Sequence, residues 1–462
     1  KADNFFSSRI VWKAEKGKAV VITKFSNTHT PVDHSTVKGI IASSGIASFG
    51  DATIRDIVKL ANQIEQASGT PFVRMELGVP GLQPSVIGKN AEIEALESGV
   101  AARYPMLEGV PVLKNEAARF IKLFMDVDLT PACCFPTVGS MQGAYAAFMM
   151  LGNIDPVKTT TLFIDPGFAA QKLQLNVLGQ RHLSLDIGNY RGNRLKDKLE
   201  EYVSKGDISA IIYSNPNNPT WMCLTEAELK IIAEISDQYD VIAIEDLAYF
   251  AMDFRKDLSK PGIPPFQPTI AKYTDNYILL ISSSKAFSYA GQRVGLLVIS
   301  PELLKRNYPQ LGKRFGSENF GYVLVYRLFN AFSLGASHSC QHGLAAVLKA
   351  ANNGKYHFLD DVREYARRAV VAKDIFRSAG FDILYDKDLD EPIGDGFYFT
   401  VAYPGMSGAE LVERLLFYGI SAVSLSGTGS DREGLRVCMS QLGEEKIQLL
   451  KRRISCFASD YK

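Results

Sequence analysis

A hydroxyl-rich segment, Ser282-Ser283-Ser284-Lys285, directly follows an apolar run, and Arg293 comes eight residues after the lysine. Partial burial and a neighbouring cation lower the pKa of a lysine, and the neutral amine can then form an imine with a carbonyl group. Serine hydroxyls and a guanidinium fork are suitable donors to a phosphate. The segment therefore indicates carbonyl chemistry beside an anion site, with a solvated loop lysine as the alternative.

A second apolar run, Val241–Ile244, ends in the carboxylates of Glu245 and Asp246. A buried carboxylate is costly unless it meets a cation or a hydrogen-bond donor. Asp246 is therefore suited to hold a protonated heterocyclic nitrogen. Tyr249 follows three residues later, where its hydroxyl could reach a nearby oxygen.

Three further segments at the ends of apolar runs carry groups that bind anions or flat rings. Ser214–Thr220 reads Ser-Asn-Pro-Asn-Asn-Pro-Thr, which is either a donor-rich binding turn or an ordinary turn. Thr137–Gly143 opens a predicted helix with small residues, so its N-terminus is an anion site or a simple cap. Phe168, just past Asp165, is placed either to stack on a planar ring or to pack in the core.

Together these segments describe a carbonyl-capturing lysine, a phosphate site, a carboxylate for a ring nitrogen and an aromatic face. This combination predicts a pyridoxal 5′-phosphate (PLP) site, in which the protein positions the cofactor and tunes its ring. The order of Asn-Pro-Asn-Asn-Pro-Thr, Ser-x-Ser-Lys and the downstream arginine resembles the class I and II aminotransferases of the fold-type-I PLP enzymes. The resemblance extends over most of the chain, from Met75-Glu76-Leu77-Gly78 to Leu435-Arg436-Val437-Cys438.

The resemblance implies a role for each matching residue at the reacting end of the cofactor. Lys285 matches the lysine that forms the Schiff base and then carries a proton between the substrate Cα and the cofactor's C4′. Asp246 matches the partner of the pyridinium nitrogen. Tyr249 and Asn218 match the pair that hydrogen-bonds the cofactor's 3′-oxygen.

The resemblance also implies residues for the phosphate and for the substrate. The phosphate site would be formed by Gly139, Ser140, Met141, Ser282 and Arg293. Phe168 matches the ring-stacking aromatic. Arg436 matches the arginine that holds the substrate α-carboxylate, with Asn218 and the backbone near Gly78 assisting. Tyr104 matches a tyrosine donated to the neighbouring subunit's phosphate, which implies a homodimer with shared active sites.

The sequence departs from the family pattern at three positions. Trp221 stands where a glycine usually follows Asn-Pro-Thr, and Met141 and Gln341 stand where dicarboxylate-specific members place a cation. A second carboxylate in a partly dry site needs a cation. We therefore expect transamination between a 2-oxo acid and an L-amino acid with an uncharged, apolar or aromatic side chain. Arg327 or Lys38 could supply a cation instead.

Short apolar runs alternate with helical stretches between about residues 90 and 350, at Thr161–Ile164, Ala210–Tyr213, Val241–Ile244, Tyr277–Ile281 and Val294–Ile299. This alternation predicts an α/β fold, and the resemblance implies a three-layer α-β-α large domain with a mostly parallel sheet and a smaller α+β domain. Residues 88–350 are expected to form the large PLP-binding domain, and 351–462 the small one. Residues 1–87 are expected to contribute to the small domain and the interface.

Composition excludes several other classes of protein. The chain has 462 residues and a formal net charge of +1, which gives no general reason to bind nucleic acid or an anionic membrane. No apolar run reaches the roughly 18 residues of a membrane-spanning helix. Six scattered cysteines predict free thiols and no metal site, hence a cytoplasmic protein. The first residues lack a signal-peptide pattern, although a trimmed leader stays open because the sequence begins at Lys1.

Two alternative functions use the same expected cofactor. A PLP-dependent lyase or decarboxylase would use the same Lys285, Asp246 and Arg436, because only the geometry over the ring decides which Cα bond breaks. A non-catalytic PLP-sensing regulator would need a DNA-reading segment. Residues 1–70 show no basic helix-turn-helix pattern.

Overall fold

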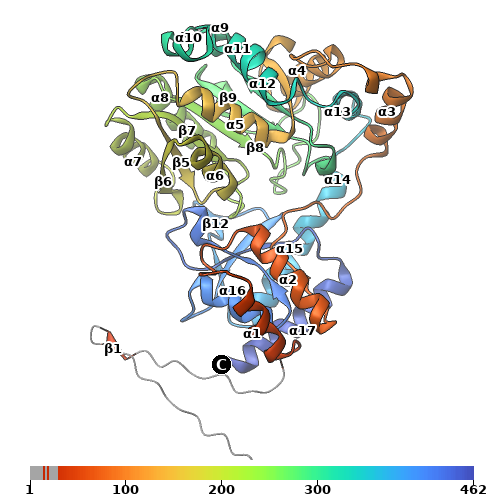
Figure 1. The fold of residues 1–462 in the computed structure, drawn as a ribbon, viewed down its shortest axis with the longest axis vertical. Coiled ribbons are helices and arrows are strands. Elements are labelled where there is room, and N and C mark those ends of the chain that lie inside the picture. The colour runs from red at the N-terminus through yellow and green to blue at the C-terminus, as the bar shows by residue number, and fades with distance from the viewer. Residues whose placement is uncertain (1–13, 16–17, 20–29, 462) are drawn as a thin grey trace, which may run out of the picture.

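The computed structural model describes residues 14–15, 18–19 and 30–461, so most of the first 29 residues of the N-terminal segment expected at the small domain and the interface lie outside it. The described chain forms a larger and a smaller unit (Figure 1). All six cysteines are free thiols, as expected, and five of them are buried. Among the described helices, none combines the length and apolarity needed to cross a membrane.

The described part of the larger unit contains a seven-stranded sheet in the order β4-β10-β9-β8-β7-β5-β6. The strand bounds are β4 Cys134–Thr137, β5 Thr160–Asp165, β6 Arg181–Asp186, β7 Ile208–Ser214, β8 Ile242–Leu247, β9 Tyr277–Ser282 and β10 Gly295–Ile299. Neighbouring strands are parallel except at β10, which is antiparallel to both β9 and β4. This arrangement confirms the expected mostly parallel sheet.

The strands predicted for this unit correspond to β5, β7, β8, β9 and β10, with ends that differ by a few residues. Two strands were not predicted. β4 contains Pro136, and β6 has its first four residues at least partly exposed. Both lie at the edges of the sheet, where a proline is tolerated and apolar residues are not required on both faces.

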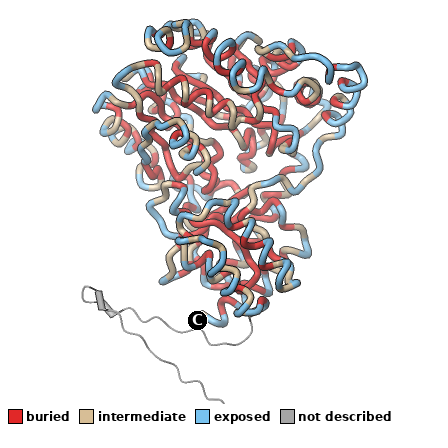
Figure 2. Tube along the Cα trace, in the orientation of Figure 1, coloured by how far each residue is buried: buried red, intermediate tan, exposed pale blue. Residues whose placement is uncertain are grey.

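Helices cover both faces of the sheet because successive strand residues point in opposite directions. Ile212 and Ile244 pack with α5 (Gly139–Leu151) and α6 (Ala169–Leu178) in one core. Ile211 and Ala243 face the other core, which includes α4, α7, α8 and α13. Their bounds are Pro111–Met125, Arg194–Val203, Glu226–Tyr239 and His338–Asn352. The layers confirm the expected α-β-α architecture, and the buried residues concentrate in its sheet (Figure 2).

The smaller unit combines both ends of the described chain around one core. Its four-stranded antiparallel sheet has the order β11-β14-β17-β16, with bounds Asp382–Leu384, Tyr398–Ala402, Leu435–Cys438 and Val423–Ser424. Helices α1 (His34–Ser43) and α2 (Ile54–Ser68) share this core with the C-terminal helices α15 (Glu364–Ser378), α16 (Gly408–Phe417) and α17 (Glu444–Asp460). The domain ends expected after residues 87 and 350 stay predictions.

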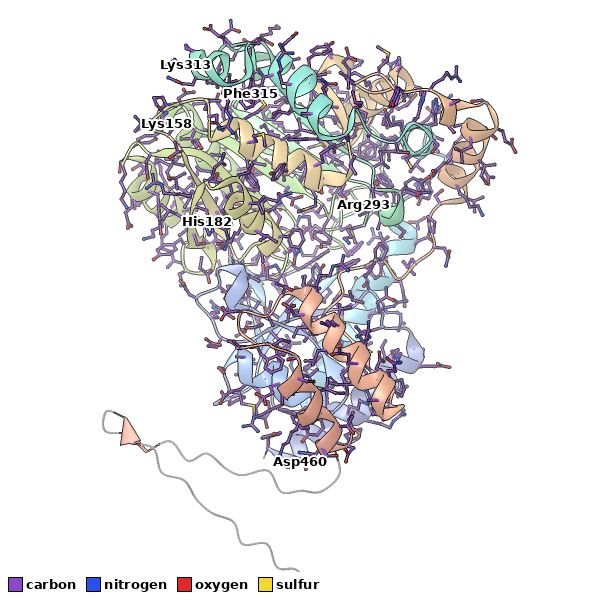
Figure 3. The ribbon with its side chains drawn as sticks, viewed as in Figure 1. Lys158, His182, Arg293, Lys313, Phe315 and Asp460 are labelled. Atoms are coloured by element: carbon purple, nitrogen blue, oxygen red, sulfur yellow. The ribbon has the colours of Figure 1, made fainter. Side chains whose placement is uncertain are left out.

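The direction of the strands determines where the polar segments meet. The carboxyl ends of β4, β5, β7, β8 and β9 lie at one edge of the sheet, and the start of antiparallel β10 lies at the same edge. Ligands of open α/β sheets bind outside this edge. Arg293, just before β10, lies on the side of the larger unit that faces the smaller one (Figure 3).

Candidate active site

Lys285 lies in the turn after β9 and points toward the segment that links the two units. Its Nζ donates a hydrogen bond to the Gly78 carbonyl and lies 5.3 Å from the centre of the Phe397 ring. Burial and, to a smaller extent, the positive charges of Arg436 and Arg293 lower the pKa of the Lys285 ammonium to about 8. The neutral amine that a nucleophile or base requires is therefore far more populated near neutral pH than for an ordinary lysine.

Asp246 ends β8 as a buried carboxylate held by two donors. The Gln171 amide donates to Oδ2 at 2.7 Å, and the Ala248 backbone N–H donates to Oδ1 at 3.0 Å. Burial raises the pKa of Asp246 to about 6, although both hydrogen bonds oppose the rise. A cationic ring nitrogen beside this carboxylate would stabilise its ionised form.

The predicted phosphate-binding residues gather where β4 leads into α5. Gly139 has φ +64°, and its N–H donates to the Arg293 carbonyl at 3.0 Å. A Cβ at residue 139 would lie 2.4 Å from the Arg293 guanidinium, so only glycine allows this approach. Ser283 fixes the neighbouring loop by donating to the Val294 carbonyl at 2.5 Å. This close packing brings Arg293 to the N-terminal end of α5, which favours anions.

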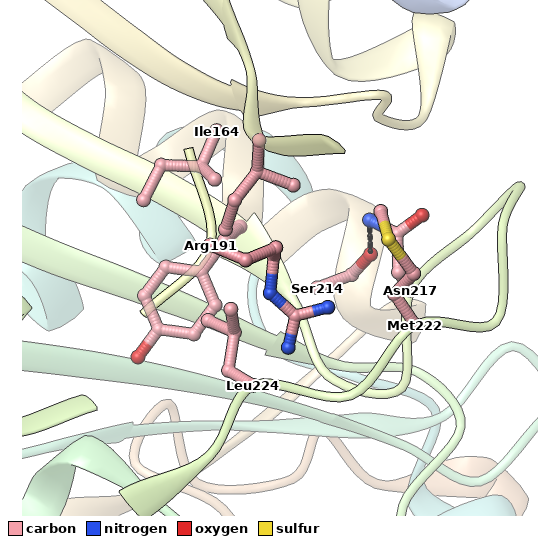
Figure 4. Close-up of a pocket in the computed structure, with 8 residues that line it drawn as sticks. Ile164, Arg191, Ser214, Asn217, Met222 and Leu224 are labelled. Atoms are coloured by element: carbon pink, nitrogen blue, oxygen red, sulfur yellow. Dashed lines mark hydrogen bonds between the residues drawn. The ribbon is translucent and has the colours of Figure 1, made fainter. Parts of the chain in front are cut away.

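The Asn-Pro turn after β7 is held by its own side chains. The Asn217 amide donates to the Pro166 carbonyl at 2.8 Å, and its oxygen accepts from the Thr220 hydroxyl at 2.7 Å. The Asn218 N–H donates to the Ser214 hydroxyl at 3.1 Å. A small cavity lies beneath the turn, and Figure 4 shows Asn217 and Ser214 on its wall.

Tyr249 meets an aromatic cluster that links the two units. Its hydroxyl donates to the Tyr398 hydroxyl at 3.0 Å. The Tyr249 ring lies 5.1 Å from that of Trp221 and 5.6 Å from that of Phe397. Burial raises the pKa of Tyr249 well above its ordinary value, so the phenol keeps its proton and remains a donor.

Arg436 projects from β17 in the smaller unit and is almost fully buried. Its Nη2 donates to the Glu76 carbonyl at 2.5 Å, and its guanidinium lies 4.7 Å from the centre of the Tyr398 ring. The buried Nε has no hydrogen-bond partner in the described chain. A buried, unsatisfied guanidinium nitrogen is costly and suits a carboxylate ligand.

The structure does not bring every predicted residue into these contacts. Phe168 precedes α6 one turn before Gln171, and the Met141 carbonyl accepts from Gln174 at 2.8 Å. Ser140 follows Gly139 in α5, and the Ser282 hydroxyl accepts from the Ser284 N–H at 3.1 Å. Tyr104 is 84% exposed, and no contact within the described chain joins it to Lys285.

Sequence reasoning missed Gln171, Tyr398 and Phe397. Gln171 carries a signal that could have been used, because it lies three residues after Phe168 in a helix that starts at the same sheet edge. Tyr398 and Phe397 come from the smaller unit. Their positions depend on how the two units pack.

The residues above combine a lysine of lowered pKa, a buried carboxylate and Arg293 at one edge of the large sheet with Arg436 from the smaller unit. The sequence profile of a single family, described as aminotransferase class I and II, matches residues 79–454. The chain belongs to this family. Members of the family are enzymes that generally depend on PLP and transfer amino groups between amino acids and oxo acids.

Relatives and solved structures match between 56% and 90% of this chain. An aspartate aminotransferase of Pyrococcus horikoshii is 27% identical to this aminotransferase, over 86% of this chain and 93% of its own. An aromatic-amino-acid aminotransferase of Thermococcus litoralis is 27% identical over 56% of this chain and 63% of its own. The structure of an aminotransferase from Mycobacterium tuberculosis superposes with a TM-score of 0.72 at 18% identity, covering 90% of this chain and 98% of its own. The last comparison shows the shared fold.

Asp246→Asn tests the burial of this carboxylate in the cofactor-free protein. The folded pKa of about 6 lies above the ordinary value of 3.8, so protonation stabilises the fold below pH 4 and this contribution is lost as pH rises through 6. Between pH 4 and 7 the wild type should lose about 2–3 kcal/mol more stability than the variant. Urea unfolding at several pH values measures this difference.

Asp382→Asn, which changes an exposed aspartate of β11, is the matched control and should leave the pH dependence unchanged. Parallel stability profiles for the wild type and Asp246→Asn would contradict the shifted pKa.

Proposed function

We propose that this aminotransferase binds PLP at the Lys285 site and transfers the amino group of an L-amino acid with an uncharged side chain to a 2-oxo acid. The observation that carries the proposal is the charge of the site. Lys285, Arg293 and Arg436 each donate to a backbone carbonyl, and none of them pairs with a carboxylate in the described chain. Their charges suit two anions, a cofactor phosphate and a substrate carboxylate.

The residues present fit PLP. The approach of Arg293 to Gly139 leaves backbone N–H groups and a guanidinium for the phosphate, and the Arg436 Nε remains for a carboxylate. Asp246, at the end of the neighbouring strand, suits the ring nitrogen. When bound, PLP supplies a carbonyl that forms imines with amines and a ring that withdraws electrons from the substrate Cα.

The chain's own residues would bind the substrate and move its proton. Arg436 holds the α-carboxylate, and the aromatic rings of Phe397 and Tyr398 exclude water around it. Once free, the Lys285 amine accepts the proton from the substrate Cα, because its lowered pKa leaves about half of it neutral near pH 8. Tyr249 stays protonated, so with PLP bound its hydroxyl would donate a hydrogen bond to the 3′-oxygen and accept one from Tyr398 in place of donating to it, while Asp246 would keep the ring nitrogen protonated.

The proposed specificity rests on Met141 and Gln341, which stand at the two positions where dicarboxylate-specific members of the family place a cation. The amide of Gln341 is held by the backbone, since its oxygen accepts from the Val110 N–H at 2.8 Å and its nitrogen donates to the Ala336 carbonyl at 2.9 Å. Met141 is an adaptable apolar side chain. The printed names of relatives include both aspartate and aromatic amino acids, so the names leave the choice open.

We also propose a homodimer in which Tyr104 completes the partner's phosphate site. Its exposed ring lies in a segment rich in exposed apolar side chains, which on a monomer would face water. They include Val86, Ile87, Ile93, Leu96, Met106 and Val112. Helix α3 (Val86–Glu97) presents four of them, so a second copy of this chain is the occupant that would cover this surface.

Borohydride reduction tests the cofactor lysine. Reduction of the PLP-loaded enzyme should fix the cofactor on Lys285, as peptide mapping can locate. Lys285→Ala should lose the imine absorbance and transaminate about a thousandfold more slowly, because both nucleophile and base are gone. Lys305→Ala, which changes an exposed lysine, is the control. Labelling of another lysine would refute the assignment.

Substrate specificity follows from kcat/KM for phenylalanine, leucine, methionine, aspartate and glutamate. The kcat/KM for the uncharged substrates should exceed that for the acidic ones by about tenfold or more. Met141→Lys supplies a cation and should narrow this difference, whereas Met141→Leu should not. A tenfold preference of the wild type for aspartate would overturn the proposed side-chain class.

Mixed dimers test the contribution of Tyr104. Tyr104→Ala subunits should bind PLP about tenfold more weakly, because a phosphate hydrogen bond is lost. A dimer of one Tyr104→Ala and one Lys285→Ala subunit retains one intact site. At limiting PLP it should recover activity that neither parent variant shows. Failure of the mixture to recover activity would contradict the shared site.

A further inference from the structure

Trp221 occupies a conformation that a bulky side chain rarely adopts. Its φ is +66°, in the left-handed region that disfavours residues with a Cβ, and its side chain is completely buried. Its N–H donates to the Asn217 carbonyl at 2.9 Å and so closes the turn that carries Asn218. A strained backbone conformation persists only where the surrounding structure holds it in place. The contacts of the Trp221 ring are therefore expected to stabilise this conformation.

The indole of Trp221 fills a space that a glycine leaves open in the smaller unit. A Cβ at Gly396 would lie 2.1 Å from Cε2 of the indole and 2.4 Å from its Nε1. No side chain other than hydrogen fits at position 396 while the indole is in place. Gly396 directly precedes Phe397, and β14 begins at Tyr398, so the indole fixes the backbone just before this strand.

The same indole lies edge-on to both tyrosines of the hydrogen-bonded pair. The ring centres of Trp221 and Tyr249 are 5.1 Å apart at an angle of 66°, and those of Trp221 and Tyr398 are 6.4 Å apart at 65°. The two tyrosine hydroxyls are 3.0 Å apart. One side chain therefore contacts both rings whose hydroxyls form this hydrogen bond.

The turn is also held by its own hydrogen bonds, and a small cavity beneath it is lined by Ser214, Asn217, Met222 and Arg191 (Figure 4). The indole packs on the side of the smaller unit. The contact between Trp221 and Gly396 therefore ties the Asn218 turn to the segment that leads into β14.

We infer that Trp221 is a positioning residue that locks the Asn218 turn and the Tyr249 hydroxyl in the orientation needed for the cofactor's 3′-oxygen. It acts through Asn218 and Tyr249, without itself touching the reacting atoms. The inference rests on the proposed function, because the 3′-oxygen belongs to PLP. Hydrogen bonds to this oxygen draw electron density from the imine nitrogen, so their loss makes that nitrogen more basic.

The pH titration of the imine absorbance tests this role without measuring turnover. In PLP-loaded Trp221→Ala the pH midpoint of the band should rise by about 0.5 or more, and PLP should bind about tenfold more weakly. Trp221→Phe, which keeps an aromatic edge, should restore most of both values. Phe320→Ala removes a fully buried ring far along the chain and should destabilise the fold while leaving the midpoint unchanged.

A double-variant cycle tests the contact itself. Gly396→Ala alone should shift the midpoint and weaken PLP binding, because its Cβ displaces the indole. In the Trp221→Ala background the same substitution should add little, since the colliding ring is absent. Equal effects of Gly396→Ala in both backgrounds would contradict the coupling.

Fluorescence provides a readout in the cofactor-free chain. The sequence has two tryptophans, so Trp12→Phe leaves Trp221 as the only indole. Its emission should be that of a buried ring, and Gly396→Ala should shift it to longer wavelength. An unchanged emission would contradict displacement of the indole.

If the wild type forms no reducible imine at Lys285, the proposed function fails. If it does and Trp221→Ala leaves midpoint and affinity unchanged, only this inference fails.

Discussion

The constraint on which the site depends is the grouping of three cations without carboxylate partners in the described chain: Arg436 is buried, Lys285 is half-buried and Arg293 is exposed. Lys285, Arg293 and Arg436 are held by backbone carbonyls of Gly78, Ala290 and Glu76, which are dipoles and do not cancel a full charge. Repulsion among the cations is relieved in part by deprotonation of the lysine. An arrangement of this kind gives up stability in the free protein and recovers it when anions bind.

The larger unit could be predicted from the sequence because its inner strands are continuous apolar runs. The polar residues of the candidate site lie at the ends of these runs. The apolar runs at β7, β8 and β9 are buried on both faces, and the polar residues at Ser214, Asp246 and Ser282 mark their ends. Parallel pairing then brings these ends together without further information. The edge strands β4 and β6 escaped prediction, since an edge strand carries a weaker apolar signal.

The contacts across the two units could not be predicted. Tyr249 reaches Tyr398 of the smaller unit over 149 residues of sequence, and Trp221 reaches Gly396 of the same unit. Pattern and propensity are local, whereas these pairs depend on the packing of surfaces that no short segment determines. The family resemblance supplied the position of Arg436, but not the aromatic rings around it. The departure at Trp221 was visible in the sequence, and its partner Gly396 was not.

The shared core of the smaller unit has a consequence for how the chain is made. The helices α1 and α2 are synthesised before the larger unit, but their apolar faces pack against α15, α16 and α17, which follow that unit in the chain. The larger unit can therefore complete its own core while these early helices still expose theirs. During translation the apolar faces of α1 and α2 stay uncovered until α15, α16 and α17 have been made.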